Sequence, residues 1–271
     1  MKPINYIGGS SAAIRAVCES GDFQLRTALL PSHVMSAEFE NFLRDKDVPF
    51  HVFSDREALF RQISLYEKCS VFLIYKLDTI IKQELIDLYS FFNIPLGNLR
   101  TNRGARPDIW TILEGHQETA VTLHKIDADI DAGTVVAEKD MAVSQNEDPP
   151  RVRQRMEGHF PEILSALRAY LEGGRPGYTV PKGPYKRRIR ETDFTIDLAR
   201  DSLDVIDRKI RSQREYNGAV LWINGHKYYV RSCALAGPGD TIENRATENP
   251  PSRIGDQRIL VKAGVHTLEF R

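Results

Sequence analysis

The feature that most constrains the fold is an alternation of short apolar runs with helix-like stretches over the first half of the chain. Strand-like runs are expected at residues 6–7, 25–30, 51–53, 70–75 and 94–97. The run at 70–75, SVFLIY, is almost continuously apolar, as expected for a central strand buried on both faces. Alternating strand and helix signals predict an α/β fold with a mostly parallel, doubly wound sheet.

Helix starts are marked by side chains that can cap a first turn. Ser10 and Ser11 suit an N-cap, and either Ser54 or Asp55 can cap a later helix. Further helices are expected through residues 39–42, over 80–91, and as one long amphipathic helix from Pro149 that ends at Gly173-Gly174. The turn at 8–11, GGSS, lacks the full pattern of a dinucleotide site, so we interpret it as a tight strand-to-helix turn.

The pattern changes towards the C-terminus, where a basic segment rich in Pro and Gly, RPGYTVPKGPYKRRIR, reads as an exposed linker. Beyond it we expect a helix at 202–212, strands at 220–223, 227–231, 259–261 and 267–270, and a mobile loop at 238–251. The predicted domains are therefore a catalytic-type domain over 1–180, a linker over 181–190 and a small β-rich, barrel-like domain over 191–271.

Composition excludes several classes of function. The 271 residues carry 37 Lys plus Arg against 37 Asp plus Glu, so no global field would gather nucleic acid or a membrane surface. No apolar run approaches the roughly 18 residues of a membrane span, and no signal-like segment opens the chain. The three cysteines form no CxxC pair, which favours reduced thiols and a cytoplasmic location. Neither zinc-like ligand spacing nor a GxSxG elbow is present, so we expect no metal and no serine hydrolase chemistry.

Two polar residues stand at the ends of two predicted strands. Asn98 follows the apolar run at 94–97, and Asp131 lies on a turn closed by Gly133 just after a second run at 120–126. Open α/β sheets expose such strand ends to a ligand crevice. The sequence therefore predicts that an amide and a carboxylate converge on one pocket.

The segments RGARPDIW and TAVTLHKIDADIDAG, together with the order of elements, resemble the folate-dependent formyltransferases, and the C-terminal segment resembles the small β-barrel module of several members. The family's motif is Asn-x-His, then Ser-Leu-Leu-Pro and a few residues before Arg-Gly. On this resemblance the family's Asn corresponds to Asn98, its His to Arg100, its Arg-Gly to Arg103 and Gly104, and its later Asp to Asp131. The segment before Arg103 is then some five residues shorter than in the family.

The resemblance implies transfer of a formyl group from 10-formyltetrahydrofolate to the amine of a small metabolite, such as an amino sugar or an amino acid derivative. Arg is always protonated, so Arg100 cannot act as a general base and would instead anchor negative charge. Asn98 would polarise the formyl carbonyl, and Asp131 would accept the proton of the attacking amine. Two alternatives remain open: a divergent homologue with altered acyl-transfer or hydrolytic chemistry, and a non-catalytic folate-binding homologue.

The resemblance also implies which residues hold the donor and the acceptor. The expected donor contacts are Tyr75, Lys76, Leu77, Ile126, Asp127 and Asp129, and the expected acceptor contacts are Asn102, Arg103, Trp110 and His124. Because a His on a strand is more often a packed residue with a satisfied ring, that interpretation of His124 stays open beside ligand contact.

The C-terminal segment argues against a nucleic-acid partner. Residues 191–271 hold 12 Asp plus Glu and 12 Lys plus Arg, whereas a tRNA-binding module usually carries a positive balance. We therefore expect a small-molecule amine, no tRNA and no membrane as partners, with a homodimer as an open alternative.

Overall fold

The computed structural model describes residues 1–129, 131–235, 259–263 and 266–270, and these residues fall into two compact units. The first unit comprises Met1–Gly104, Thr119–Met141 and Gln154–Tyr185, and the second comprises Ala105–Glu118, Ala142–Arg153 and the described part of Lys186–Arg271. The sequence predicts instead a domain over 1–180 and another over 191–271. In the structure, residues 105–118 and 142–153 group with the C-terminal stretch.

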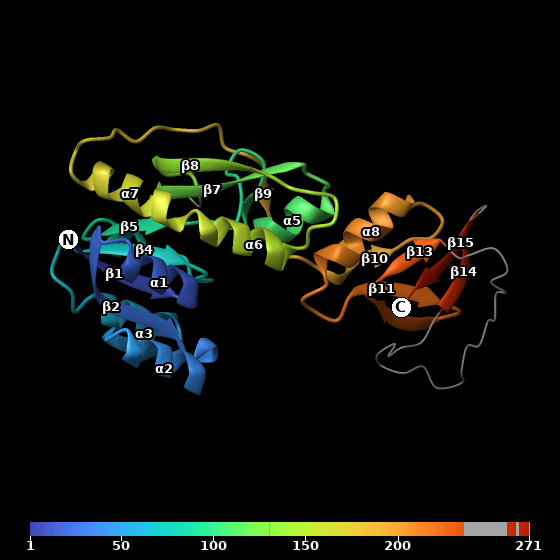
Figure 1. Ribbon diagram of the computed structural model, residues 1–271, viewed down its shortest axis with the longest axis horizontal. Coiled ribbons are helices and arrows are strands. Elements are labelled where there is room, and N and C mark those ends of the chain that lie inside the picture. The colour runs from blue at the N-terminus through green and yellow to red at the C-terminus, as the bar shows by residue number, and fades with distance from the viewer. Residues whose placement is uncertain (130, 236–258, 264–265, 271) are drawn as a thin grey trace. The chain divides into compact units, whose positions relative to one another are not determined.

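A seven-stranded sheet forms the centre of the first unit, in the order β3-β2-β1-β4-β5-β7-β8 (Figure 1). Its strands are β1 (Lys2–Gly8), β2 (Phe23–Pro31), β3 (Phe50–Phe53), β4 (Val71–Tyr75), β5 (Ser90–Asn93), β7 (Glu118–Lys125) and β8 (Val135–Ala142). Strands β1 to β5 pair in parallel, and β7 runs antiparallel to β5. The predicted mostly parallel α/β sheet is confirmed.

Helices flank this sheet (Figure 1), with α1 packed against β2 and α7, and α3 against β3. They are α1 (Ser11–Glu19), the 3-10 turn η1 (Ser32–Val34), α2 (Ala37–Asp45), α3 (Arg56–Ile63), α4 (Gln83–Ile86), α6 (Pro149–Gly158) and α7 (Phe160–Leu171). Ser10 caps α1 by accepting the N–H of Ala13, and Asp55 caps α3 by accepting the N–H of Ala58. Both caps agree with the sequence-based expectation.

Three predicted elements differ from the structure. The helix predicted at 80–91 is reduced to Gln83–Ile86, because Phe91 and Phe92 are buried in strand β5. The strand predicted at 94–97 is wrong for the same reason, since the strand ends at Asn93. The single helix expected from Pro149 breaks at residue 159, where Pro161 has no N–H to continue the ladder. Moving the strand end from 97 to 93 changes which polar side chain stands at the edge of the sheet.

The second unit is rich in strands, as the sequence predicts. It holds α5 (Pro107–Leu113), the 3-10 turn η2 (Glu191–Asp193), β10 (Thr195–Ile196), α8 (Leu203–Ser212), β11 (Ala219–Ile223), β12 (His226–Val230), β13 (Cys233–Leu235), β14 (Ile259–Ala263) and β15 (His266–Phe270). These strands form two three-stranded sheets, β10-β11-β12 and β13-β15-β14. Ile206 and Ile210 of α8 pack with Leu221 and Phe270 in one apolar core. The predicted loop at 238–251 lies outside the described residues.

Two short strands mark places where the chain passes between the units. They are β6 (Arg103–Gly104) and β9 (Tyr185–Lys186).

An ionic network joins three separate stretches of chain within the second unit. The buried carboxylate of Asp108 accepts hydrogen bonds from Arg106 at 3.1 and 3.0 Å and from Arg153 at 2.5 Å. Glu215 contacts both arginines, and Arg106 also donates to the hydroxyl of Tyr216. Burial alone would lower the pKa of Arg106, but Asp108 and Glu215 outweigh it and raise that pKa. The network therefore ties α5, the start of α6 and the segment after α8 together.

Candidate active site

Asn93 and His124 meet across the junction of β5 and β7. The antiparallel register places Asn93 directly opposite His124, and directly opposed residues have side chains on the same face about 5 Å apart. The Asn93 Nδ2 lies 3.4 Å from the His124 Nε2. The His124 side chain is only 2% exposed, so the imidazole is held in a dry environment at the end of its strand.

Asp131 completes a cluster of three side chains within the first unit. Its Oδ1 lies 3.4 Å from the His124 Nε2, and its Oδ2 accepts the backbone N–H of Gly104 at 2.9 Å. Asp131 has a left-handed backbone with φ of 50°, and the loop is tight enough that a Cβ on Gly133 would lie 1.8 Å from the Lys125 carbonyl oxygen. With 13% of its side chain exposed, Asp131 is the more accessible partner of the buried imidazole.

The other two residues predicted to be catalytic lie in the loop after β5 and contact different groups. The Asn98 Oδ1 accepts the backbone N–H of Arg100 at 2.8 Å, which makes a local turn. The Arg100 guanidinium forms an ion pair with Glu138, and this hydrogen bond raises the pKa of Arg100. Tyr178 also approaches Glu138, at 3.4 Å. The structure thus brings Asp131 together with Asn93 and His124, while Asn98 and Arg100 engage each other and β8.

The predicted acceptor contacts Asn102 and Arg103 lie next to a strap of chain at 182–185. Asn102 is fully buried, and its N–H donates to the Asn98 carbonyl at 2.8 Å. The Arg103 Nε donates to the Gly183 carbonyl at 2.8 Å, and its guanidinium lies over the ring of Tyr185. Arg103 therefore holds the strap against the loop whose next residue, Gly104, binds Asp131.

The predicted donor contacts are of two kinds. Leu77 and Ile126 are partly buried and pack against one hydrophobic cluster. Lys76 has a left-handed backbone with φ of 59°, and its Nζ lies 2.9 Å from Glu157. The other three residues predicted to contact the donor also bond to neighbouring protein groups. The Tyr75 hydroxyl donates to Glu157 at 3.0 Å. Asp127 accepts the N–H of Asp129 at 3.1 Å, and the Asp129 carboxylate pairs with Lys182 at 2.6 Å.

Trp110 belongs to the second unit. Its indole Nε1 donates to the Arg187 carbonyl at 3.0 Å, and the side chains of Lys186 and Arg187 lie over its ring. The polar atom of this side chain is therefore already bonded to the protein.

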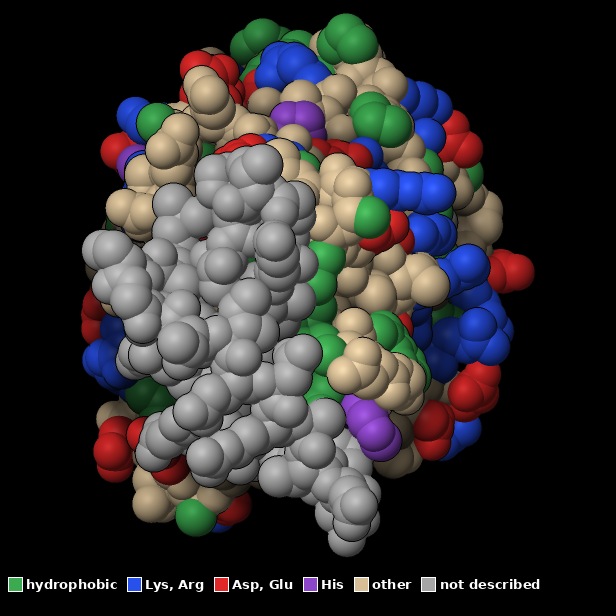
Figure 2. All heavy atoms as spheres, turned by 90° about the vertical axis from the view of Figure 1, so that its right-hand side faces the viewer, with side chains coloured by type: hydrophobic (Ala, Val, Ile, Leu, Met, Phe, Trp, Pro, Cys, Tyr) green, Lys and Arg blue, Asp and Glu red, His purple; other side chains and the backbone are tan. Residues whose placement is uncertain are grey.

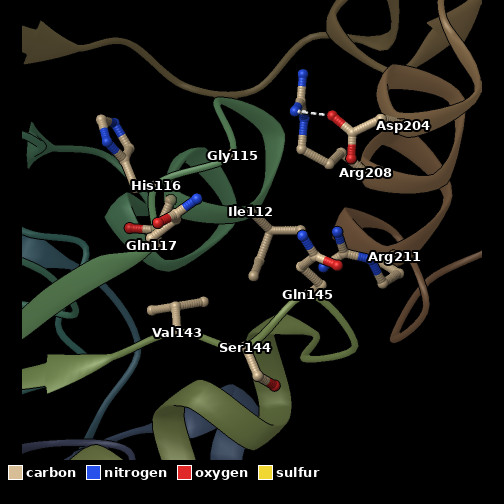
Figure 3. Close-up of a pocket in the computed structure, with 11 residues that line it drawn as sticks. Ile112, Gly115, His116, Gln117, Val143, Ser144, Gln145, Asp204, Arg208 and Arg211 are labelled. Carbon is tan, nitrogen blue, oxygen red and sulfur yellow. Dashed lines mark hydrogen bonds and ion pairs between the residues drawn. The ribbon is translucent and has the colours of Figure 1, made fainter.

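A cavity of about 110 Å³ lies within the second unit (Figure 3). It is lined by α8, by the end of α5 with its following loop, and by residues 143–145. In it Arg208 donates to Asp204, and its buried Nε has no hydrogen-bond partner among the described residues. None of the residues predicted for the site lines this cavity. In the described part of the chain, no group of three or more His, Cys, Asp or Glu side chains could hold a metal ion, and no helix is long and apolar enough to cross a membrane.

Asn93 was missed by the sequence-based prediction because the strand was placed at 94–97, which made Asn98 the first polar residue after it. The spacing offered a signal. The family's motif is about five residues too long for a start at Asn98, and Asn93 lies five positions earlier. A motif that starts at Asn93 reaches Arg103-Gly104 without any shortening, and Pro95 then occupies the place of the family's His.

Comparisons with known proteins give relatives and solved structures, while no family model matches. A methionyl-tRNA formyltransferase from Koribacter versatilis is 28% identical over 200 residues, which are 69% of this chain and 59% of that protein. HypX from Aquifex aeolicus in complex with tetrahydrofolic acid superposes with a TM-score of 0.68 at 17% identity, over 98% of this chain and 43% of that chain. An N-formyltransferase from Helicobacter canadensis, in complex with folinic acid and dTDP-3-aminofucose, has a TM-score of 0.66 at 15% identity, over 100% of this chain and 99% of that chain.

The fold is that of a formyltransferase-like α/β protein with a further strand-rich region. The sequence relatives and the solved structures together support the assignment predicted from the motifs, a folate-dependent formyltransferase family. The chain spans 59% of the length of the curated relative from Koribacter versatilis.

Proposed function

We propose that this protein transfers a formyl group from 10-formyltetrahydrofolate to the amine of a small metabolite. The observation that carries the proposal is the cluster of Asn93, His124 and Asp131 at the junction of β5 and β7. Acyl transfer to an amine needs a donor for the developing oxyanion and a group that accepts the amine proton. The cluster contains an amide and a carboxylate, each 3.4 Å from the His124 Nε2.

The amide role is given to Asn93 in place of Asn98. The Asn98 Oδ1 closes its own turn on the N–H of Arg100, whereas Asn93 stands in the cluster beside His124. Arg100, paired with Glu138, keeps a role as a fixed cation near the loop and takes no proton. Asp131 keeps the proton-handling role predicted from the sequence.

The donor is supported by chemistry and by likeness. Leu77 and Ile126 are partly buried apolar side chains packed against one hydrophobic cluster, and such side chains suit contact with a flat pterin ring. Two of the solved structures with this fold are complexes named for tetrahydrofolic acid and folinic acid. The donor is a substrate that is consumed and released as tetrahydrofolate.

The acceptor is proposed to be a small amine, with nucleotide-linked amino sugars as the first class to test. The relative from Helicobacter canadensis is complexed with dTDP-3-aminofucose. Several basic side chains in the described part of the second unit are paired with acids: Arg187, Lys209 and Lys227 pair with Asp193, Asp201 and Glu191. Figure 2 shows acidic side chains among the basic ones on the face that it presents. This mixed charge suits a small acceptor better than a tRNA.

The test is mass spectrometry of reactions that contain the purified protein, 10-formyltetrahydrofolate and pooled amines. The pools hold amino sugars, nucleotide-linked amino sugars and amino acids, and a separate arm contains methionyl-tRNA. A product heavier by one formyl group is expected in a small-amine pool. Asp131→Asn should lower kcat by roughly a hundredfold to ten-thousandfold, and Glu40→Gln, at an exposed ion pair, should leave it unchanged.

The other outcomes separate the alternatives. Formylation of methionyl-tRNA alone would overturn the small-amine acceptor and keep the reaction. Release of formate without any formylated amine would indicate hydrolytic chemistry. Tight binding of folinic acid with an intact donor in every pool would indicate a non-catalytic folate-binding protein. The cytoplasmic location and the homodimer stay predictions.

A further inference from the structure

His124 is held by three groups, and their chemistry decides where its proton lies. The Nδ1 is 3.1 Å from the Lys125 carbonyl oxygen, which can only accept a hydrogen bond. The Nδ1 must therefore carry the hydrogen. In the neutral ring the Nε2 is then an unprotonated acceptor, and the Asn93 amide at 3.4 Å donates to it.

The same Nε2 faces the carboxylate of Asp131 at 3.4 Å. A lone pair opposite a carboxylate oxygen forms no hydrogen bond. A proton added at the Nε2 creates a charge-assisted one, because the imidazolium then donates to Asp131. Asp131 is therefore placed to accept the hydrogen bond of an imidazolium formed during the reaction, and its charge compensates the charge that appears on the ring.

We infer that His124 is the group that takes the proton from the attacking amine, and that Asp131 acts through it by orienting the ring and stabilising the imidazolium. This inference rests on the proposed function. The imidazole then comes from His124 of strand β7. The position that corresponds to the family's His in the Asn-x-His motif holds Pro95. We expect the acceptor amine to approach the cluster from the side at which Asp131 is partly exposed.

The reaction step balances with these groups alone. The nitrogen of the neutral amine attacks the formyl carbon, and the carbonyl π electrons move to the oxygen, which accepts a hydrogen bond from the Asn93 amide. The nitrogen, now positive, gives a proton to the His124 Nε2. The bond between the formyl carbon and N10 of the folate then breaks, and His124 returns its proton to N10. The products are the formamide and tetrahydrofolate, and the ring is neutral again.

A structural role makes a different prediction. A buried histidine that merely packs between β5 and the Asp131 loop would lower stability and folate binding together when it is removed. A proton acceptor, in contrast, would lower kcat while the affinity for the donor stays the same. Added imidazole would restore kcat only in the second case, since free imidazole can supply a base but cannot repack a strand.

The test uses the full chain with a small amine that the wild type formylates. His124→Ala is compared with wild type and with His51→Ala, a histidine on the surface of the same sheet. Binding of folinic acid, measured calorimetrically, checks that the site is intact. We expect kcat of His124→Ala to fall by roughly a hundredfold to ten-thousandfold, folinic acid affinity to stay within threefold, and added imidazole to recover at least tenfold of kcat.

A second variant guards against loss of folding. His124→Gln keeps a polar group of similar length beside Asn93, so it should bind folinic acid as wild type does and still lose kcat. If His124→Ala and His124→Gln both keep kcat within threefold of wild type, the inference is overturned and the proposed function stands. It is also overturned if both bind folinic acid like wild type, lose kcat and gain nothing from imidazole. A wild-type protein that formylates no acceptor overturns the proposed function, and this inference with it.

Discussion

The sharpest test of the structure outside the candidate site is Asp108→Asn. Asp108 has no exposed side-chain surface, and it accepts hydrogen bonds from Arg106 at 3.1 and 3.0 Å and from Arg153 at 2.5 Å. Removal of its charge leaves two guanidinium groups sharing Glu215. Loss of one partner from a buried ion pair costs about 3–5 kcal/mol. The retained amide can still accept one hydrogen bond, so we expect about 3 kcal/mol.

The assay is urea unfolding of the whole chain followed by tryptophan fluorescence. The chain has two tryptophans, Trp110 and Trp222, and both lie in the second unit, so the signal reports that unit. With a denaturant slope of about 1–3 kcal/mol per molar urea, the midpoint should fall by about 1–3 M. Arg200→Gln breaks an exposed ion pair with Asp197 in the same unit and should cost no more than ~0.5 kcal/mol. A fall for Asp108→Asn no larger than for this control would refute the argument.

Three further predictions concern the Asp131 loop, the thiols and acid stability. Gly133→Ala would place a Cβ 1.8 Å from the Lys125 carbonyl oxygen, so the Asp131 loop must shift. In the formyl-transfer assay kcat/KM should therefore drop by about a hundredfold. Unchanged activity would contradict this prediction. Burial raises the pKa of Cys233 to about 11. At pH 8 a thiol reagent should therefore label the exposed Cys69 at least about tenfold faster than Cys233. Equal labelling rates for the two thiols would contradict the burial of Cys233. Burial alone would raise the pKa of Glu215, but the two arginines hold it below its usual range. Its stabilising effect is therefore fully present above the pKa of an unfolded glutamate, about 4.3, and is lost as the pH falls below it. Glu215→Gln should show a weaker fall of the urea midpoint on acidification.

The sequence predicts the architecture well where the signal is local. The apolar run that becomes β4 needs burial on both faces, and side chains that can cap a helix stand at Ser10 and Asp55. The segment 80–91 resists such prediction because Phe91 and Phe92 suit an apolar helix face as well as a strand. Their place in β5 is decided by pairing with β4 and β7, which are distant along the chain.

The candidate site depends on that decision. Asp131 is visible in the sequence as an acid on a tight loop, and the resemblance to a formyltransferase family fixes its expected role. His124 is visible in the sequence only as a polar residue within an apolar strand. The sequence alone does not distinguish a packed core histidine from one that takes part in the chemistry of the site.

The sequence alone therefore determines the fold class, the family resemblance and the candidate carboxylate, Asp131, because local patterns and short motifs carry that information. Only the tertiary structure decides which amide and which imidazole accompany the acid. The register of β7 against β5 sets Asn93 opposite His124, and the left-handed turn at Asp131 brings its carboxylate to the same ring. Register between strands about 30 residues apart is a property of the packed sheet, since a slip of one residue would turn His124 to the opposite face.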